Sequence, residues 1–167
     1  VRYGAAVVLI EIGSPAVPAL VEALGDSNEY VRYAAAVALG AIGDPQAVPH
    51  LIQALGDSDR DVRRAAAEAL GSMGDPQAVT HLIQALGDED EDVRCAAVKS
   101  LAKIGSPALP ALIKALGDKD ENARGAWILA ALLPRHTGNL CVEMMDSKWL
   151  VRRGAAEALG KIGDPQA

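Results

Sequence analysis

Apolar residues recur along the chain at the spacing of α-helices, in two patterns that alternate. The first pattern is seen in "PQAVPHLIQAL", where residues three or four apart form one apolar stripe: Val48, Leu51, Ile52 and Leu55. The second follows in "DVRRAAAEALGSMG", where the apolar side of the expected helix carries Val62, Ala66, Leu70 and Met73. Because the connection between the two is short, the patterns predict antiparallel helix pairs.

Residues that favour helix ends mark the limits of both helices. Asp44 is a favourable N-cap followed by Pro45, and Ser14 and Ser106 stand at the corresponding places. A second proline lies within the first helix and is expected to bend it, at Pro18, Pro49 and Pro110. Glycines are expected to end the first helix (Gly25, Gly56, Gly87 and Gly117) and the second (Gly43, Gly74, Gly105 and Gly163).

The two-helix unit recurs through the whole sequence. Aligned on a dipeptide of Val or Ala followed by Arg, the copies of this motif begin at residues 1, 31, 62, 93, 123 and 151, a period of 28–31 residues. A period of this length with two helices per unit is typical of solenoids, in which each unit packs only on its neighbours.

An aspartate stands six residues before each of five arginines of this motif. The pairs are Asp26 and Arg32, Asp57 and Arg63, Asp88 and Arg94, Asp118 and Arg124, and Asp146 and Arg152. Each Asp could cap the second helix, with Glu29, Glu91 and Glu121 three residues on completing a capping box. Each Arg could reach an Asp of its own repeat or of the adjacent one. We expect this ladder to fix the angle between repeats and to have no catalytic role.

Helix pairs with proline in the first helix and D-x5-R between the helices resemble HEAT repeats, and "VRxAAAxALGxIGD" resembles the HEAT-like repeats of phycobilin lyases. The resemblance covers essentially the whole chain and implies an all-α, right-handed α-solenoid. We expect a leading single helix and about five helix pairs, at about 14–43, 44–74, 75–105, 106–134 and 135–163, with half repeats at both ends. The uncapped apolar ends predict either a longer parent protein or end-to-end self-association.

Composition narrows the possible partners and the compartment. The net charge is −6, which disfavours nucleic acid because binding to phosphates requires a basic surface. Only two cysteines are present, Cys95 and Cys141 in different repeats, which fits a reducing, cytoplasmic compartment. No apolar run is long enough to span a membrane. With 3 % aromatic residues, the core must be built from small aliphatic side chains.

Little in the sequence points to catalysis, to a metal or to a cofactor. His50 and His81 occupy the same place in consecutive repeats, but no acid or cysteine at matching positions completes a metal site, so we expect both to face solvent. HEAT-like deoxyhypusine hydroxylases bind iron through His-Glu pairs, whereas His50, His81 and His136 are followed here by Leu, Leu and Thr. Cys95 is expected to be accessible, but no histidine is placed to act as its base, and Cys141 is expected in the core.

The resemblance to HEAT repeats implies that the second helices line the concave face of the solenoid. Positions that vary among these helices are therefore candidates for partner binding: Tyr3, Tyr30, Tyr33, Val37, Arg60, Arg64, Glu68, Cys95, Lys99, Trp149 and Arg153. Every tyrosine of the chain is in this set, and Tyr, Trp and Arg are enriched among residues that dominate binding energies.

One stretch, "LLPRHTGNLCVEMMDSKW", breaks the repeat. It keeps Asp146 six residues before Arg152 but loses the usual turn, and Trp127 upstream stands where other copies have Ala. A tryptophan in an alanine position requires the neighbouring helix to move. We therefore predict a change in superhelical geometry between the fourth and fifth pairs.

The sequence favours a non-catalytic scaffold that binds a protein or peptide on its concave face, without nucleic acid or membrane. The alternative is a phycobilin lyase or pigment-handling protein of the same repeat family, although no catalytic motif of those lyases can be matched here. A designed repeat array is a third reading, which the degenerate fifth pair and the differing loop lengths disfavour.

Overall fold

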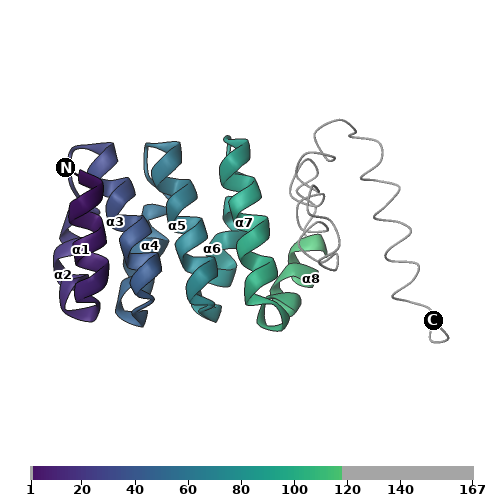
Figure 1. Ribbon diagram of the computed structural model, residues 1–167. Helices are drawn as coiled ribbons and strands as arrows, with labels where there is room; N and C mark the ends of the chain where they lie inside the picture. Colours follow the sequence, from purple (N-terminus) through teal and green to yellow (C-terminus); the bar gives the residue numbers. More distant parts are fainter. Residues whose placement is uncertain (1, 118–167) are drawn as a thin grey trace.

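The computed structural model describes residues 2–117, which form a row of stacked helices (Figure 1). The helices are α1 (Arg2–Ile12), α2 (Val17–Ala23), α3 (Glu29–Ile42), α4 (Val48–Ala54), α5 (Arg60–Met73), α6 (Val79–Ala85), α7 (Glu91–Ile104) and α8 (Leu109–Gly117). No strand occurs within these residues. The prediction of an all-α solenoid is confirmed, whereas the stretch around Trp127 lies outside the described residues.

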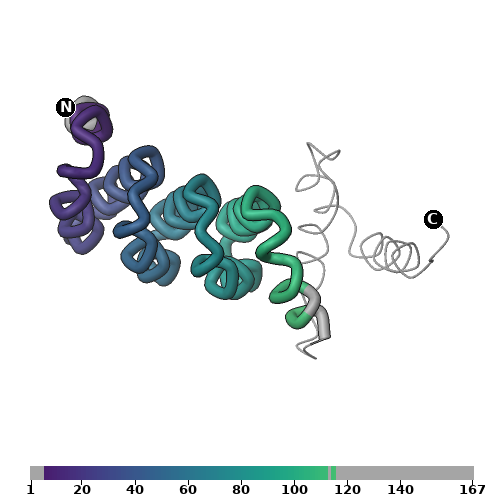
Figure 2. The backbone as a smooth tube through the Cα atoms, turned by 90° about the horizontal axis from the view of Figure 1, so that it is seen from below, coloured from purple at the N-terminus to yellow at the C-terminus, as the bar shows by residue number. Residues whose placement is uncertain are grey.

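The helices form two layers, which Figure 2 shows from one edge. The odd-numbered helices, called here the second helices, contact one another in the order α1, α3, α5, α7, and the first helices α2, α4 and α6 each pack against the second helix that follows. A continuous cluster of buried aliphatic residues extends from Ala16 to Leu112 between the layers. Each repeat therefore buries its apolar face against its neighbours, as expected of a solenoid. None of the helices seen here is both long and apolar enough to cross a membrane.

Each first helix begins with a separate 3-10 turn, and this turn changes the role of the prolines. The turns are Ser14–Ala16, Pro45–Ala47, Pro76–Ala78 and Ser106–Ala108. Pro18 and Pro49 lie at the second residue of α2 and α4, where a helix does not use the backbone N–H. The prediction that they remove a hydrogen bond inside the helix is wrong. The same break precedes α6, which has Thr80 at this position, so the second proline is not its cause.

The predicted caps of the first helices are partly confirmed. Asp44 accepts a hydrogen bond from the Gln46 N–H at 3.0 Å and caps its turn as expected. Ser14 and Ser106 are not caps, because each is the first residue of its turn and the cap position is occupied by Gly13 or Gly105.

The N-caps of the second helices are Asn28, Asp59 and Asp90, two residues after the aspartates proposed for this role. The prediction that the ladder aspartates cap these helices is wrong. Their carboxylates instead accept backbone hydrogen bonds within the turn that precedes each helix. The Asp57 carboxylate accepts from the Asp59 N–H at 2.8 Å, and Asp59 then caps α5. Glu29 and Glu91 consequently occupy the first position of their helices and not the third, so neither completes the expected capping box, whereas Glu121 lies outside the described residues. Both still lie in the first turn, where the helix dipole favours negative charge.

Glycines follow the ends of both kinds of helix as expected, but their backbone conformations differ. Gly43 and Gly74 adopt left-handed conformations, with φ of 71° and 68°, at the ends of α3 and α5. Gly25, Gly56 and Gly87 each follow the C-cap leucine of a first helix and do not have positive φ. Those ends tighten into shorter turns, such as the bond from the Gly56 N–H to the Gln53 carbonyl at 3.0 Å.

Two other glycines allow neighbouring second helices to approach closely. A Cβ atom at Gly40 would lie 2.8 Å from Cα of Ala69, and one at Gly71 would lie 2.6 Å from Cα of Ser100. At the second contact the buried Ser100 hydroxyl donates to the Ala67 carbonyl at 2.8 Å, which ties α7 to the backbone of α5. Small residues at these positions therefore set the spacing of the second-helix layer.

Arginines of the motif link each repeat to the next. Arg32 donates from Nε and Nη2 to the two carboxylate oxygens of Asp57, both at 2.7 Å, and from Nη1 to the backbone carbonyl of Asp26 at 3.0 Å. Arg63 does the same with Asp88, at 2.9 and 3.0 Å, and with the carbonyl of Asp57 at 3.0 Å. The carboxylate partner thus belongs to the next repeat, and the carbonyl partner to the arginine's own repeat.

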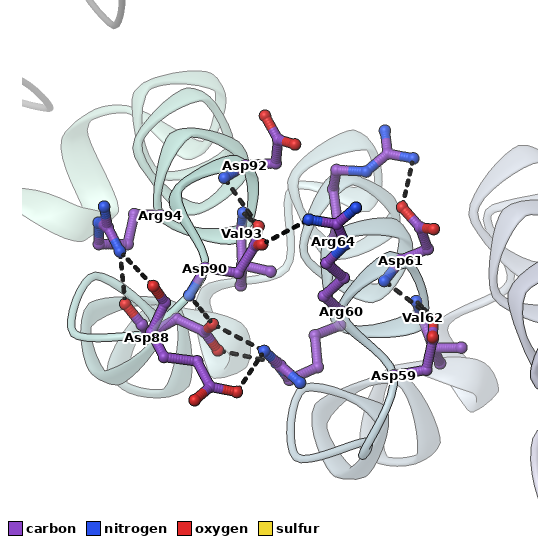
Figure 3. Close-up of polar contacts among 12 residues, drawn as sticks. Asp59, Arg60, Asp61, Val62, Arg64, Asp88, Asp90, Asp92, Val93 and Arg94 are labelled. Atoms are coloured by element: carbon purple, nitrogen blue, oxygen red, sulfur yellow. Dashed lines mark hydrogen bonds and ion pairs between the residues drawn. The ribbon is translucent and has the colours of Figure 1, made fainter. Parts of the chain in front are cut away.

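The junction between α5 and α7 shows how these links are arranged (Figure 3). Arg94 donates to the Asp88 carbonyl at 2.8 Å, while the Asp88 carboxylate receives Arg63. The Arg63 and Asp88 side chains are only 9 % and 12 % exposed, whereas Arg60, which pairs with Asp90 at 3.2 Å, is 65 % exposed. The ladder is therefore a largely buried set of bidentate contacts. Asp118, Arg124, Asp146 and Arg152 lie outside the described residues.

Burial and hydrogen bonding act in opposite directions on the ladder carboxylate of Asp57. Burial raises the pKa of Asp57, but hydrogen bonds from Arg32 and from the Asp59 N–H, together with the positive charge, leave this pKa below its ordinary value. The hydrogen bond to Asp57 raises the pKa of Arg32 against the opposing effect of burial. The charged forms of both partners are therefore the stable ones in the fold.

Replacing Gly71 by alanine is expected to destabilise the protein by about 1–3 kcal/mol, because α5 and α7 must separate to admit the methyl group. This loss opposes the gain of up to about 1 kcal/mol that alanine normally brings to a helix. Gly56→Ala is the matched control, since its added Cβ would meet only the Gln53 carbonyl oxygen at 3.5 Å. Urea unfolding of both variants measures the difference, and equal stabilities would contradict the close contact.

Truncation of Arg63 is expected to lower the free energy of unfolding by about 3 kcal/mol, because Arg63→Ala leaves a buried carboxylate without its cation. Arg60→Ala removes an exposed pair with the same neighbouring repeat and is expected to cost less than about 1 kcal/mol. Chemical denaturation of the two variants tests this ranking. Similar losses for both would show that burial does not distinguish the ladder.

Stability is also expected to fall in acid. Because the pKa of Asp57 is lower in the folded chain than its value of about 3.9 in an unfolded one, its ionised form contributes stability that is complete above that value. This contribution is lost as the pH falls through the folded-state pKa. Asp57→Asn should therefore be less stable than the wild type at pH 6, with the difference narrowing below about pH 4. Asp61→Asn controls for net charge, and a pH-independent difference at Asp57 would refute the linkage.

Candidate functional site on the second-helix face

Three positions on each of the second helices α3, α5 and α7 point to solvent and form one face, called here the second-helix face. They lie two residues before the motif arginine and five and nine residues after it. The exposed residues are Tyr30, Val37 and Ala41 on α3, Asp61, Glu68 and Ser72 on α5, and Asp92, Lys99 and Lys103 on α7. Since the second helices are stacked in register, equivalent positions form rows that cross the face. The Lys103 Nζ lies 3.5 Å from the Ser72 hydroxyl, which confirms that the third row is continuous from α5 to α7.

The face is apolar at the α1 and α3 end. Tyr30 is 65 % exposed and Val37 42 % exposed, and they lie seven residues apart on the same side of α3. Val7 on α1 is 54 % exposed in the row of Val37. Tyr33 stands between Tyr30 and Val37 but is half-buried, because its ring packs on the small cluster that contains Val62 and Ala66. These four residues, Val7, Tyr30, Tyr33 and Val37, are called the apolar patch.

The middle of the face is charged but internally paired. On α5, Arg64 donates to Asp61 at 3.4 Å and to Glu68 at 3.5 Å, one turn away on either side. Partial burial lowers the pKa of Arg64, but the charges of Glu68, Tyr33 and Asp61 raise it by a larger amount. The pKa of Arg64 therefore lies above its ordinary value. An arginine that already has two carboxylate neighbours offers little additional attraction to an acidic partner.

At the α7 end of the face, the exposure of one residue differs from the prediction. Cys95 is buried at 9 % exposure, so the expectation that it is accessible is wrong. It occupies the row of Tyr33 and Arg64, whose positions face partly inward, and a small side chain there is covered. Lys99 and Lys103 are exposed, one turn apart. Ion pairs involving either lysine are absent from the part of the chain that the structure describes.

Some of the residues predicted to bind a partner lie outside the described part of the chain, and two other residues belong to the same exposed face. Tyr3 lies in α1, but its side chain is outside the described set, and Trp149 and Arg153 are outside the described residues. Val7 and Lys103 join the candidates. Both stand at variable positions of the repeat, so the repeat alignment already contained the signal for them.

His50 and His81 take part in no metal centre formed by the described residues. His50 is exposed as expected, but His81 is half-buried, and its Nδ1 atom is buried without a hydrogen-bond partner. The prediction that His81 faces solvent is therefore only partly right. Within residues 2–117 no group of three or more His, Cys, Asp or Glu side chains is close enough to hold a metal ion. His136 and Cys141 lie beyond that range.

A shallow hollow of about 480 Å³ lies beside the ladder, lined by Ser58, Asp59, Arg60, Arg63, Glu89 and Asp90. Its charged groups are engaged with one another: Arg60 with Asp90 and Arg63 with Glu89. Its residues belong to the junction between repeats, and the hollow offers no nucleophile paired with a base. The second-helix face is therefore the best candidate for a functional surface in the described part of the chain.

The structure of the chain is similar to solved structures of two kinds. One is the complex of CpcE and CpcF of phycocyanin lyase from Nostoc sp. PCC7120, with 29 % sequence identity and a TM-score of 0.60 over 77 % of this chain and 87 % of that chain. The other is an engineered protein, with 22 % identity and a TM-score of 0.52 over 96 % of this chain and 89 % of that one. The second similarity shows the fold alone. A search of curated protein sequences found no match.

Family models agree with the repeat found in the sequence and in the helices. The model for HEAT repeats matches residues 1–70 and 48–133, and the model for the PBS lyase HEAT-like repeat matches residues 151–167. The first matches most of the chain and spans every helix described above. With two-layered helix pairs, a ladder of Asp and Arg between repeats and these matches, the chain belongs to the HEAT repeat family.

Proposed function

We propose that the chain is a binding scaffold that holds a protein or peptide on its second-helix face. The observation that carries this proposal is the exposure of Tyr30, Val37 and Val7 together at one end of that face. Exposed apolar residues that gather on one surface often mark an interaction site, and tyrosine is enriched among the residues that dominate binding. The ladder and the glycine contacts hold these residues on a rigid stack, which reduces the entropy lost on binding.

The same repeat positions on α5 and α7 support this proposal. Where α3 has Tyr30 and Val37, α5 has Asp61 and Glu68. Apart from the ladder arginine Arg63, the buried positions of the described repeats keep small or aliphatic residues, so the difference lies in the exposed rows. Exposed residues that differ from repeat to repeat, on helices whose core packing is the same, are typical of a surface that recognises a specific partner. The similar Nostoc structure is itself a complex of two chains, which fits a protein partner here as well.

A second candidate is a phycobilin lyase or a pigment-handling protein. One observation favours it: the solved structure with 29 % identity is a complex of phycocyanin lyase. A face that carries an apolar patch and, two repeats away, exposed lysines is also compatible with a bilin, whose ring system is apolar and whose propionates are anionic. Fold similarity alone is a weak basis for activity, because one fold carries many functions.

Incubation with phycocyanobilin separates the two candidates. A pigment-handling protein should shift the absorption spectrum of the bilin, or retain the bilin covalently after denaturation in acid. A protein-binding scaffold should do neither, and should instead crosslink to a partner when a photoreactive phenylalanine replaces Tyr30. The same replacement at Gln53, an exposed residue of the first-helix layer, is the matched control. Bilin retention without any Tyr30 crosslink would favour the pigment candidate.

Tyr30→Ala is expected to weaken binding of the crosslinked partner by at least about tenfold, because truncation of an anchoring tyrosine costs more than about 1 kcal/mol. The folded stability should change by no more than about 0.5 kcal/mol, since the side chain is 65 % exposed. Calorimetric titration and thermal unfolding measure the two effects separately. Unchanged affinity with the purified partner would contradict the assignment of Tyr30 to the interface.

A further inference from the structure

The cations of the second-helix face fall into two groups. Arg60 and Arg64 on α5 are each paired with carboxylates, of Asp90 and of Asp61 and Glu68 respectively. Lys99 and Lys103 on α7 are exposed, and their one polar contact in the described part of the chain joins Lys103 to the Ser72 hydroxyl. In a chain with a net charge of −6, two exposed cations one turn apart form a local positive site.

Acidic residues near this positive site confine the binding of an anion to the two lysines. The first turn of α7 carries Glu91 and Asp92, and the first turn of α5 carries Asp61. An acidic group on a partner would be repelled from that side of the face and attracted to the second half of α7, where Lys99 and Lys103 lie. The positive site therefore specifies where a partner's carboxylate can bind.

The positive site and the apolar patch lie on the same face, two repeats apart. Val37 and Lys99 occupy the same row, with Glu68 of α5 between them. Neighbouring helices pack about 8–10 Å apart, so α3 and α7 are separated by roughly 16–20 Å. An extended peptide covers about 3.3 Å per residue and needs about five or six residues to cross this distance.

We propose that the second-helix face recognises an extended peptide segment that places a large apolar side chain on the apolar patch and one or two carboxylates on Lys99 and Lys103, about five or six residues away. This inference rests on the proposed function and adds the chemistry and the spacing of the partner. The apolar residue supplies the anchor through buried area, and the two ion pairs fix direction and register. The paired charges of α5 lie beneath the middle of the segment.

A displayed library of random 12-residue peptides tests this proposal without knowledge of the partner. Selection against the intact chain is expected to enrich sequences with an aromatic or large aliphatic residue separated from Asp or Glu by about five or six positions. The selected peptides should bind the double variant Lys99→Glu/Lys103→Glu on the order of tenfold more weakly, and selection on that variant should lose its acidic preference. Lys114→Glu, at an exposed position of α8, is the matched control and should bind like the wild type.

Circular dichroism of each variant checks that the helices are intact. The other possible outcomes of the selection and binding measurements each contradict a particular part of the proposal. Peptides that depend on Tyr30 but show no acidic preference would overturn the role of Lys99 and Lys103 while leaving the proposed function in place. Enrichment of no peptide by the wild-type chain would overturn the peptide proposal, whereas the absence of any crosslink at Tyr30 would overturn the proposed function itself. A dimer that is seen by sedimentation and dissociates in Tyr30→Ala would assign the face to a second copy of the chain. Competition of phycocyanobilin with the selected peptides would assign the face to pigment. Either result would overturn the peptide proposal.

Discussion

The bidentate contact between the arginine of one repeat and the aspartate of the next is the interaction on which the stack depends. Arg63 binds the carboxylate of Asp88 and, through its remaining nitrogen, the backbone carbonyl of Asp57. A planar guanidinium that binds both a carboxylate and a carbonyl in fixed directions limits the rotation of one repeat against the other. Because the pair is largely buried, its desolvation cost offsets much of its Coulomb energy, and its main effect is on geometry.

Small residues complement this constraint on the inner side of the second-helix layer. Gly40 against Ala69 and Gly71 against Ser100 bring the helices close together, and the ladder holds their ends in register. Geometry is thus fixed by buried positions that differ little between repeats. The exposed rows take no part in it, so they can differ from an apolar pair at Tyr30 and Val37 to a cationic pair at Lys99 and Lys103. This separation of frame and surface makes a repeat protein suited to recognition.

Most of the fold was predictable, since period, apolar stripes and small residues are local properties of the sequence. The predictions that were wrong concern groups with two competing partners. Asp57 was expected to cap α5, but its carboxylate is engaged by Arg32 of the preceding repeat and by the N–H of Asp59, which takes over the cap. For the candidate site, the positions two before and five and nine after the arginine are exposed on α3, α5 and α7. The expectation that Cys95, one residue after the arginine, is accessible was wrong, because Cys95 is covered by its neighbours.

The sequence by itself determined that this protein consists of stacked helix pairs, and it determined which positions vary within a constant frame, because both follow from a periodic pattern. The tertiary structure decided which partner each polar group has. Several acids, such as Asp59 and Asp61, lie much nearer to Arg63 in sequence than Asp88 does, and only the stacking of repeats brings the carboxylate of Asp88 to its guanidinium. The same stacking places Val37 and Lys99 in one row across three helices, since contacts between residues far apart in the chain depend on packing and not on local preference.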